Sequence, residues 1–328
     1  MSSPHDDAEM ETIRPSETDI QYGKDPYRRS ISQLLDSGFV PLDKPRGPTS
    51  HQVASWLKEI LDIEKAGHMG TLDPNTTGVL PIALGSSVRT LSVTLSEGKE
   101  YVALIQFHGD VQEKELMVLA KEFTGDIYQL VPVRSAVKRG LRTRRIHYLN
   151  IPEMGERSAL MIIGCESGTY IRTLIHDIGL VLGTGAHMTE LRRSRSGNIR
   201  EDACATLQEV RDAWETYRSS GSEEEIRRVV RPIEEMLSHL PRVVIKDSAV
   251  DAVCHGAPLG HPGIVSVQTG IRDGAMVLIT SLKGEAVAIG KTMCSTTEAL
   301  TAREGLAVVV DRVLMEPGTY PRSWKVKK

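Results

Sequence analysis

The chain has 328 residues, of which 40% are hydrophobic and 4% aromatic, and its formal net charge is −3 at pH 7. This length favours two domains with an aliphatic core. The four cysteines are far apart and form no CxxC pair, which argues against a zinc knuckle and against a disulfide framework. No apolar run approaches the ~20 residues that span a bilayer, and the acidic N-terminus is unlike a targeting peptide. We therefore expect a cytoplasmic protein with no membrane segment.

The N-terminal part of the chain combines a polar tail with a strand, a helix and a second strand. Residues 1–20 are polar and aperiodic, so we expect them to be disordered. Residues 37–43 are strand-like and lead into a turn rich in Pro and Gly. Ser50 is the expected N-cap of a helix with an apolar stripe. Residues 79–84 predict a buried strand, in which Pro81 indicates an edge or irregular position.

Strand and helix patterns alternate through the middle of the chain, and a charged connector follows at residues 219–235. Two of the expected strands flank a loop rich in basic residues. The expected strands are residues 101–107, 127–133, 142–151 and 159–164; the expected helices are residues 112–123, about 170–182, and one that begins at the capping box Thr206–Glu209.

The distribution of apolar residues, glycines and prolines along the sequence changes near residue 240. Beyond this point short apolar runs recur between glycines and prolines, a pattern that is typical of a small, mostly β barrel. The part before residue 240 mixes helix and strand periodicities. We therefore predict an α+β protein with a domain boundary near residue 240.

Basic residues gather in two clusters although the chain is acidic as a whole. Residues 134–145 contain no acidic residue, and residues 192–200 lie near the single Glu190. Two such clusters favour a defined track for a polyanion such as nucleic acid; a pair of solvated faces is the alternative. The first cluster contains Arg134, Lys138, Arg139, Arg142, Arg144 and Arg145, and the second contains Arg192, Arg193, Arg195 and Arg200.

Residues 67–78, Gly-His-Met-Gly-Thr-Leu-Asp-Pro-Asn-Thr-Thr-Gly, surround one carboxylate, Asp73, with three glycines and a proline. Glycine permits unusual backbone angles and proline fixes its own, so this segment indicates a shaped loop that presents an acid. An aspartate in such a loop is more often a turn-former than a catalyst. His68 and Asp73 could also be metal ligands, but no third ligand has a recognisable spacing, so we expect no metal site.

Five segments of the chain resemble, in order, the motifs of the TruB/dyskerin family of pseudouridine synthases. They are residues 42–51, 67–78, 99–102, 168–174 and 189–197. Three further segments resemble the archaeal relatives of dyskerin, so that the resemblance covers about residues 20–325; they are residues 21–26, 135–139 and 320–324.

The resemblance implies a fold for each part of the chain. Residues 21–240 would form a pseudouridine synthase catalytic domain with a central mixed or antiparallel sheet flanked by helices. Residues 241–325 would form a PUA domain, a small β barrel that binds RNA. The N-terminal part of the catalytic domain is a candidate to pack on the PUA domain.

The resemblance also implies the roles of the site residues. Asp73 would be the essential carboxylate, either as a nucleophile or as a base that removes a ribose proton to give a glycal. Arg172 would lie beside Asp73 and keep it ionised. Tyr101 would stack on the target base and help to remove the proton at carbon 5. Without the resemblance, a surface salt bridge would be the better explanation of Arg172, and strand packing would explain Tyr101 as well.

The remaining implied residues form the pocket and the RNA contacts. Tyr170 and Leu191 would wall the pocket, and His68 would help to hold RNA from which a base has been flipped. Lys44 and the first basic cluster would contact phosphates. The reaction is an isomerisation with no redox step, so the resemblance implies no cofactor.

The implied function is the conversion of uridine to pseudouridine in rRNA, with tRNA as a further candidate. An H/ACA guide RNA would select the substrate RNA by base pairing. Small accessory proteins, including a kink-turn-binding ribosomal-like protein, would complete the particle. Two alternatives stay open: a stand-alone TruB-like synthase for the tRNA TΨC arm, and a non-catalytic RNA-binding scaffold with a PUA domain.

Overall fold

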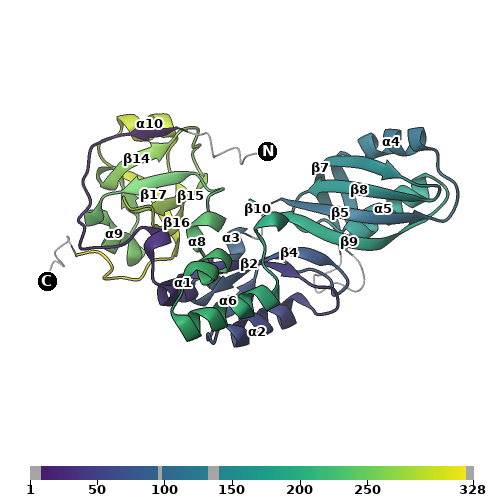
Figure 1. Cartoon of the computed structure of the whole chain (residues 1–328). Coiled ribbons are helices and arrows are strands. Elements are labelled where there is room, and N and C mark those ends of the chain that lie inside the picture. The colour runs from purple at the N-terminus through teal and green to yellow at the C-terminus, as the bar shows by residue number, and fades with distance from the viewer. Residues whose placement is uncertain (1–8, 95–97, 132–139, 323–328) are drawn as a thin grey trace.

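The computed structural model describes residues 9–94, 98–131 and 140–322. Within these residues the chain forms two β-sheets, one of ten strands and one of seven. The larger sheet extends through an elongated α+β region, and the smaller sheet lies at one end of it (Figure 1). No helix of the described residues is long and apolar enough to cross a membrane.

The ten-stranded sheet is mixed, because β4 and β9 pair in parallel while the other neighbours pair antiparallel. β3 (Ala66–His68) pairs with β4, and β10 (Ile199–Arg200) pairs with β9. The main path is β11 (Arg231–Pro232), β2 (Gly38–Lys44), β4 (Thr77–Leu84), β9 (Ala186–Ser196), β5 (Lys99–Phe107), β8 (Ser158–Cys165), β7 (Leu141–Met154) and β6 (Gly125–Leu130).

Two groups of helices cover the two halves of this sheet and bury separate apolar cores. The first half carries α1 (Ile31–Ser37), α2 (Ser50–Ile60), α6 (Leu207–Ser220) and α7 (Glu224–Val229), and the second carries α4 (Glu113–Glu122) and α5 (Ile171–Val181). The shorter helices are α3 (Leu91–Thr94), α8 (Ile233–Met236) and the 3-10 turns Pro26–Arg28, Gly85–Thr90 and Glu201–Ala203.

The seven-stranded sheet has its own core of aliphatic residues. Its strand order is β1 (Met10–Thr12), β14 (Ile264–Gln268), β12 (Arg242–Ile245), β15 (Met276–Thr280), β16 (Ala286–Thr292), β17 (Leu306–Val313) and β13 (Leu259–Gly260). The region also contains α9 (Asp247–Cys254), α10 (Thr296–Thr301) and the 3-10 turn His261–Gly263. The expectation of α+β architecture with a mostly β C-terminal part is confirmed.

The prediction of a disordered tail over residues 1–20 is wrong for its described part. Residues 10–12 form β1, which pairs antiparallel with residues 266–268 of β14. The three side chains of β1 are exposed, so the strand shows no apolar periodicity. Backbone hydrogen bonds to an open sheet edge stabilise it instead. Residues 1–8 lie outside the described residues.

Two local predictions also need correction. Thr49, not Ser50, is the N-cap of α2 and forms a capping box with Gln52. Pro81 lies inside the sheet, because β4 pairs with β2 along most of its length. Its partner in the ladder is Pro41. Neither proline has an N–H to donate, and their carbonyls accept instead from the amides of Met69 (to Pro81, 2.9 Å) and Ala205 (to Pro41, 2.9 Å).

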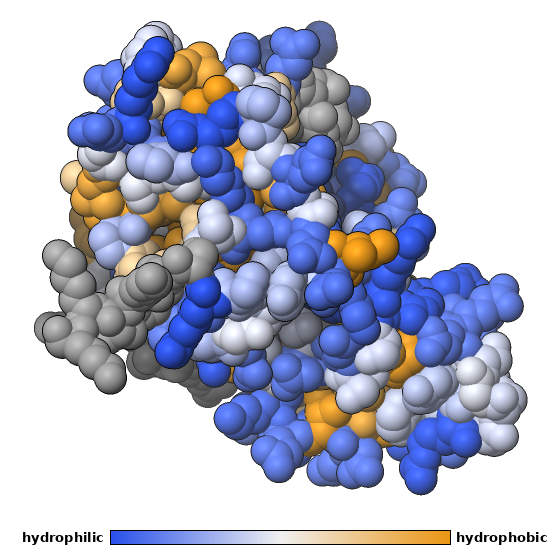
Figure 2. Space-filling view, turned by 90° about the vertical axis from the view of Figure 1, so that its left-hand side faces the viewer, coloured by the Kyte–Doolittle hydropathy of each residue, from blue (hydrophilic) through white to orange (hydrophobic). Residues whose placement is uncertain are grey.

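A shared apolar core joins the two regions. Phe39 and Val79 of the larger sheet pack in one cluster with Leu278 and Ile289 of the smaller sheet. The Glu234 carboxylate accepts a hydrogen bond from the Ala286 amide (2.9 Å) at the same junction. The face shown in Figure 2 is mostly hydrophilic with separate hydrophobic patches. The β-rich region is therefore fixed to the α+β region by buried contacts.

Candidate active site

The loop that carries Asp73 lies between β3 and β4 and is fixed by the segment before α2. The Ser50 hydroxyl accepts a hydrogen bond from the Leu72 amide (2.8 Å) and donates one to the Leu72 carbonyl (3.1 Å). The Gly47 amide donates to the Pro74 carbonyl (2.8 Å). The backbone is therefore tied on both sides of Asp73, so the loop presents this carboxylate in a defined place.

Lys44 lies at the end of β2 beneath this loop, and its side chain is fully buried. Its ammonium donates to the carbonyls of Pro45 (2.9 Å), Pro74 (3.1 Å) and Thr76 (2.9 Å). An ammonium has three protons, so no donor remains for a phosphate. Burial lowers the pKa of Lys44, while the Asp73 charge opposes this shift. The prediction that Lys44 binds RNA is therefore wrong.

Arg172 lies in the first turn of α5, and its guanidinium forms an ion pair with the Asp73 carboxylate. The two side chains are 61% and 59% exposed. The described residues therefore leave the Asp73 carboxylate open to solvent.

Tyr170 is the N-cap of α5 and directly precedes the residue that begins this helix. Its amide donates to the side-chain oxygen of Gln129 (3.0 Å), and the Gln129 amide group donates back to the Tyr170 carbonyl (3.1 Å). Gln129 belongs to β6 and is buried. This pair of bonds fixes the start of α5 and thus the position of Arg172.

Tyr101 of β5 lies opposite Arg193 of β9 in an antiparallel pairing. Ala103, two residues later in β5, lies opposite Leu191, two residues earlier in β9. Side chains two residues apart share a face of a strand, so Tyr101, Leu191 and Arg193 point to the same side. Tyr101 is partly exposed, yet burial of its hydroxyl raises its pKa; the Arg193 charge lowers the pKa and Asp73 raises it. Tyr101, Arg193 and Asp73 therefore belong to one electrostatic group.

His68 lies on β3 at the start of the same loop and is partly buried. Its Nδ1 is buried without a hydrogen-bond partner. Burial lowers the pKa of His68, and the nearby charges of His51 and Arg193 lower it further, so His68 is neutral at pH 7. It lines a cavity of about 350 Å³ together with His51 and Lys58.

The first basic cluster lies partly on a hairpin. β6 and β7 pair antiparallel, with Arg144 opposite Ile127 and Arg145 opposite Asp126. Arg145 is 61% exposed and lies 3.4 Å from Asp126. Arg142 of β7 is partly exposed, as is Arg144, whose Nε is buried without a partner. The other expected members of the cluster, Arg134, Lys138 and Arg139, lie outside the described residues.

Two members of the second basic cluster, Arg192 and Arg193, are not available to a polyanion. Arg192 makes a bidentate ion pair with Asp43 (2.9 and 3.0 Å) and another with Glu201 (2.7 Å). Arg193 is buried, with 1% of its surface exposed. The interpretation of this cluster as an RNA-binding face is therefore wrong for Arg193, and its neighbour Arg192 is already neutralised by carboxylates.

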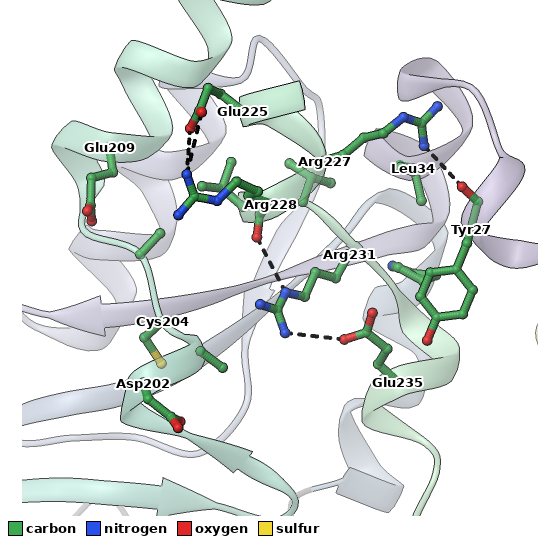
Figure 3. Close-up of a pocket in the computed structure, with 15 residues that line it drawn as sticks. Tyr27, Leu34, Asp202, Cys204, Glu209, Glu225, Arg227, Arg228, Arg231 and Glu235 are labelled. Atoms are coloured by element: carbon green, nitrogen blue, oxygen red, sulfur yellow. Dashed lines mark hydrogen bonds and ion pairs between the residues drawn. The ribbon is translucent and has the colours of Figure 1, made fainter. Parts of the chain in front are cut away.

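A separate cavity of about 460 Å³ lies between the N-terminal segment and α7 (Figure 3). Its arginines point toward acids or carbonyls of its own walls. Arg228 pairs with Glu225 (3.2 Å), and Arg231 pairs with Glu235 (3.4 Å). Burial raises the pKa of the Cys204 thiol in this cavity to about 12, which makes it unreactive. Both of these arginines in the cavity wall are therefore already paired with carboxylates.

The Asp73 site combines a solvent-accessible carboxylate, an adjacent guanidinium, a tyrosine hydroxyl and two buried cations. A carboxylate held this way can attack an electrophilic carbon or accept a proton. No group of three or more His, Cys, Asp or Glu side chains that could hold a metal occurs in the part of the chain that the structure describes.

Sequence reasoning missed three residues of this site. Ser50 and Arg193 hold backbone atoms of the Asp73 loop. Gly78 has a positive φ of 101°, and a Cβ at this position would lie 2.2 Å from the Arg193 carbonyl oxygen, so only glycine lets β4 approach β9 there. All three residues lie within the motif segments 42–51, 67–78 and 189–197, which were the signal available in the sequence.

The fold and the site together define an RNA-modifying type of enzyme with an accessory β domain, and family models give the class. They match residues 58–171 (TruB family pseudouridylate synthase, N-terminal domain), 172–238 (tRNA pseudouridylate synthase B C-terminal domain), 241–314 (PUA domain) and 5–54 (DKCLD domain). The chain belongs to the TruB family of pseudouridylate synthases.

Curated relatives extend over nearly the whole chain. The probable tRNA pseudouridine synthase B of Methanopyrus kandleri is 53% identical over 98% of this chain and 95% of its own length. The protein of the same name from Methanocaldococcus jannaschii is 50% identical over 99% of this chain and 96% of its own length. The chain is therefore a pseudouridine synthase similar to archaeal proteins.

Solved structures agree with the fold. A chain in the structure of an H/ACA RNP bound to a substrate RNA containing 2′-deoxyuridine has a TM-score of 0.91 and 46% identity, covering 98% of this chain and 99% of that one. A chain in a Cbf5-Nop10-Gar1 complex has a TM-score of 0.91 and 48% identity, covering 97% and 98%. The prediction of a pseudouridine synthase domain joined to a PUA domain is confirmed.

Proposed function

We propose that this enzyme isomerises selected uridines in RNA to pseudouridine under the direction of an H/ACA guide RNA, with Asp73 as its essential carboxylate. The observation that carries the proposal is the ion pair between Asp73 and Arg172, in a chain that matches almost all of a protein solved in an H/ACA RNP with substrate RNA. The same pair argues against a non-catalytic scaffold, which would need no solvent-accessible carboxylate.

Asp73 begins the reaction at the ribose of the target uridine. It either attacks carbon 1′ as a nucleophile or removes a ribose proton to give a glycal; both routes break the bond to nitrogen 1. The Arg172 guanidinium pairs with the carboxylate and orients it. The base then rotates and carbon 5 bonds to carbon 1′; this step releases the Asp73 carboxylate from carbon 1′ on the nucleophilic route, or returns the proton to carbon 2′ on the glycal route. The proton on carbon 5 is then lost while nitrogen 1 gains one.

The base lies against Tyr101, which stacks on it and acts in removal of the carbon 5 proton. Leu191 and Tyr170 form apolar walls. The uridine reaches this site by base flipping, which costs a few kcal/mol. His68, with its unpaired Nδ1, accepts or donates a hydrogen bond to the opened RNA. The exposed arginines of the β6–β7 hairpin contact phosphates in a salt-sensitive way.

The PUA domain, residues 241–325 in our domain assignment, would hold the guide RNA. Small accessory proteins complete the particle, as the Nop10 and Gar1 of a similar solved complex do, and a kink-turn-binding ribosomal-like protein would bind the guide. Residues 21–240 would form the catalytic domain. Archaeal relatives support reaction in the cytoplasm.

A second candidate function is guide-independent modification of tRNA, with the TΨC-arm uridine as target. It is favoured by the name of the relatives, probable tRNA pseudouridine synthase B. Because one active site would serve both substrates, the two functions differ only in how the RNA is selected.

Reconstitution separates the two functions. The purified chain is incubated with a bare tRNA transcript, and separately with guide RNA, target RNA and accessory proteins; pseudouridine is then mapped. We expect strong formation on the guided target that requires the guide. Strong activity on tRNA without any stimulation by the guide would overturn the guided function, and activity retained by Asp73→Ala would overturn the assignment of the carboxylate.

A further inference from the structure

Arg193 has the largest fully buried side chain among the described residues. Its Nε donates to the Val79 carbonyl (2.7 Å) and its Nη2 donates to the Gly70 carbonyl (3.2 Å). In the portion of the chain that the structure describes, no carboxylate forms an ion pair with it. A buried cation without an anionic partner is costly, so this arginine is unusual for a residue that only fills space.

The Arg193 guanidinium also lies close enough to the Tyr101 hydroxyl for its charge to lower the pKa of that hydroxyl. The two residues are directly opposed in the pairing of β5 and β9. Gly78 brings β4 against the Arg193 backbone from the other side. Arg193 is therefore fixed between two strands and lies beside the Tyr101 phenol.

We propose that Arg193 is a positioning residue that orients the Tyr101 hydroxyl and supplies the positive charge against which Tyr101 becomes a phenolate. This inference rests on the proposed function, in which Tyr101 removes the proton from carbon 5. The phenolate, whose own proton has passed to solvent, takes the carbon 5 proton. The C–H electron pair restores the C5–C6 double bond, and nitrogen 1 gains a proton from solvent.

Electrostatics defines what Arg193 opposes, because the pKa of Tyr101 is raised overall. Burial is the largest effect and raises this pKa, the Asp73 charge raises it further, and the Arg193 charge is the largest effect that lowers it. Lys44 lies in the same group of charges but donates its three protons to backbone carbonyls. Arg193 is thus the cation that lies opposite the phenol and lowers its pKa.

A purely structural role for Arg193 makes a different prediction. If it only held the carbonyls of Gly70 and Val79, its loss would slow the reaction whether or not Tyr101 carried a hydroxyl. A positioning role requires that hydroxyl. A double-mutant cycle over Arg193→Gln and Tyr101→Phe therefore distinguishes the two.

The cycle uses single-turnover kinetics on whichever RNA the wild-type enzyme modifies in the reconstitution above. General-base catalysis contributes about 10²–10⁴-fold, so we expect Arg193→Gln to slow the wild type by about 10–100-fold. In the Tyr101→Phe background the same change should slow the single-turnover rate by less than about threefold. The matched control is Arg192→Gln, on the same strand but paired with Asp43, which should stay within about twofold.

A second measurement replaces the carbon 5 hydrogen of the uridine with deuterium. If Arg193 assists deprotonation, Arg193→Gln should raise the isotope effect on the rate toward the value of Tyr101→Phe, and Arg193→Lys should restore part of the rate. Should Arg193→Gln fail to fold, Arg193→Lys takes its place in the cycle, and an isotope effect equal to that of wild type would overturn the inference.

The outcomes separate this inference from the function on which it rests. A wild-type enzyme inactive on both RNAs would overturn the proposed function. An active wild type with equal costs of Arg193→Gln in both backgrounds would leave the function intact and would show that Arg193 is only structural.

Discussion

Two groups of positively charged side chains in this enzyme lie in different environments, one buried and one exposed to solvent. Lys44 and Arg193 lie buried beneath the Asp73 loop, and both donate hydrogen bonds to backbone carbonyls. Arg142 and Arg145 lie on the β6–β7 hairpin with exposed surface. A buried cation with its donors used can act only on the protein, whereas an exposed one can meet a phosphate.

Replacement of Lys44 by methionine should have the largest effect. Three carbonyls lose their donor, and an unsatisfied buried polar group costs about 1–3 kcal/mol. We expect an activity loss of more than about 100-fold, since displacement of the loop by even 1 Å has this size of effect, with a lower melting temperature. Lys121→Met, an exposed lysine on α4, is the control and should leave both unchanged. Weaker RNA binding with an unchanged single-turnover rate would mean that Lys44 contacts RNA after all.

Arg172→Lys tests the boundary between the two groups, because Arg172 is exposed but paired with Asp73. Lysine keeps the charge and loses the planar fork that orients a carboxylate. We expect the single-turnover rate to fall by about 10–100-fold, with RNA affinity nearly unchanged. The rate at saturating RNA and the Kd for RNA are measured separately. If the rate and the RNA affinity fell by the same factor, Arg172 would belong with the phosphate-binding cations.

The comparison also shows how far sequence could lead. Strand and helix periodicity predicted β5, β7, β8 and α5 well, and the capping box at Thr206 is present as expected. These features depend on neighbouring residues alone. The motif order also led to Asp73 and Arg172, which the structure brings together.

Other features depend on residues far apart in the chain. The burial of Arg193 follows from the pairing of β9 with both β4 and β5, strands that lie about 100 residues earlier in the sequence. Lys44 is buried because the loop folds back over the end of β2. The sequence does not show which basic residues become buried when distant strands pair. Composition alone therefore could not distinguish the buried cations from the exposed ones.

The exposed group should respond to salt. Replacing Arg142 and Arg145 together with glutamine removes two charges, and each lost phosphate contact reduces the slope of log affinity against log salt by about 0.7 for single-stranded RNA. We expect binding weaker by about three- to tenfold at low salt, with an unchanged rate at saturating RNA. Titrations at several salt concentrations measure the slope. Arg157→Gln, paired with Asp110 outside the hairpin, should not change it.

The smallest expected effect is a gain in RNA affinity, whereas the changes above reduce activity or affinity. Asp126 lies 3.4 Å from Arg145, with both side chains about 60% exposed, and an exposed pair of this kind is worth about 0.2–1 kcal/mol. Asp126→Asn frees Arg145 for phosphate and should tighten RNA binding about twofold at low salt. Asp110→Asn removes the same charge elsewhere, at the Arg157 pair. If both changes tightened RNA binding equally, the net charge of the protein would set the affinity. The exposed arginines of the hairpin would then have no specific role in RNA binding.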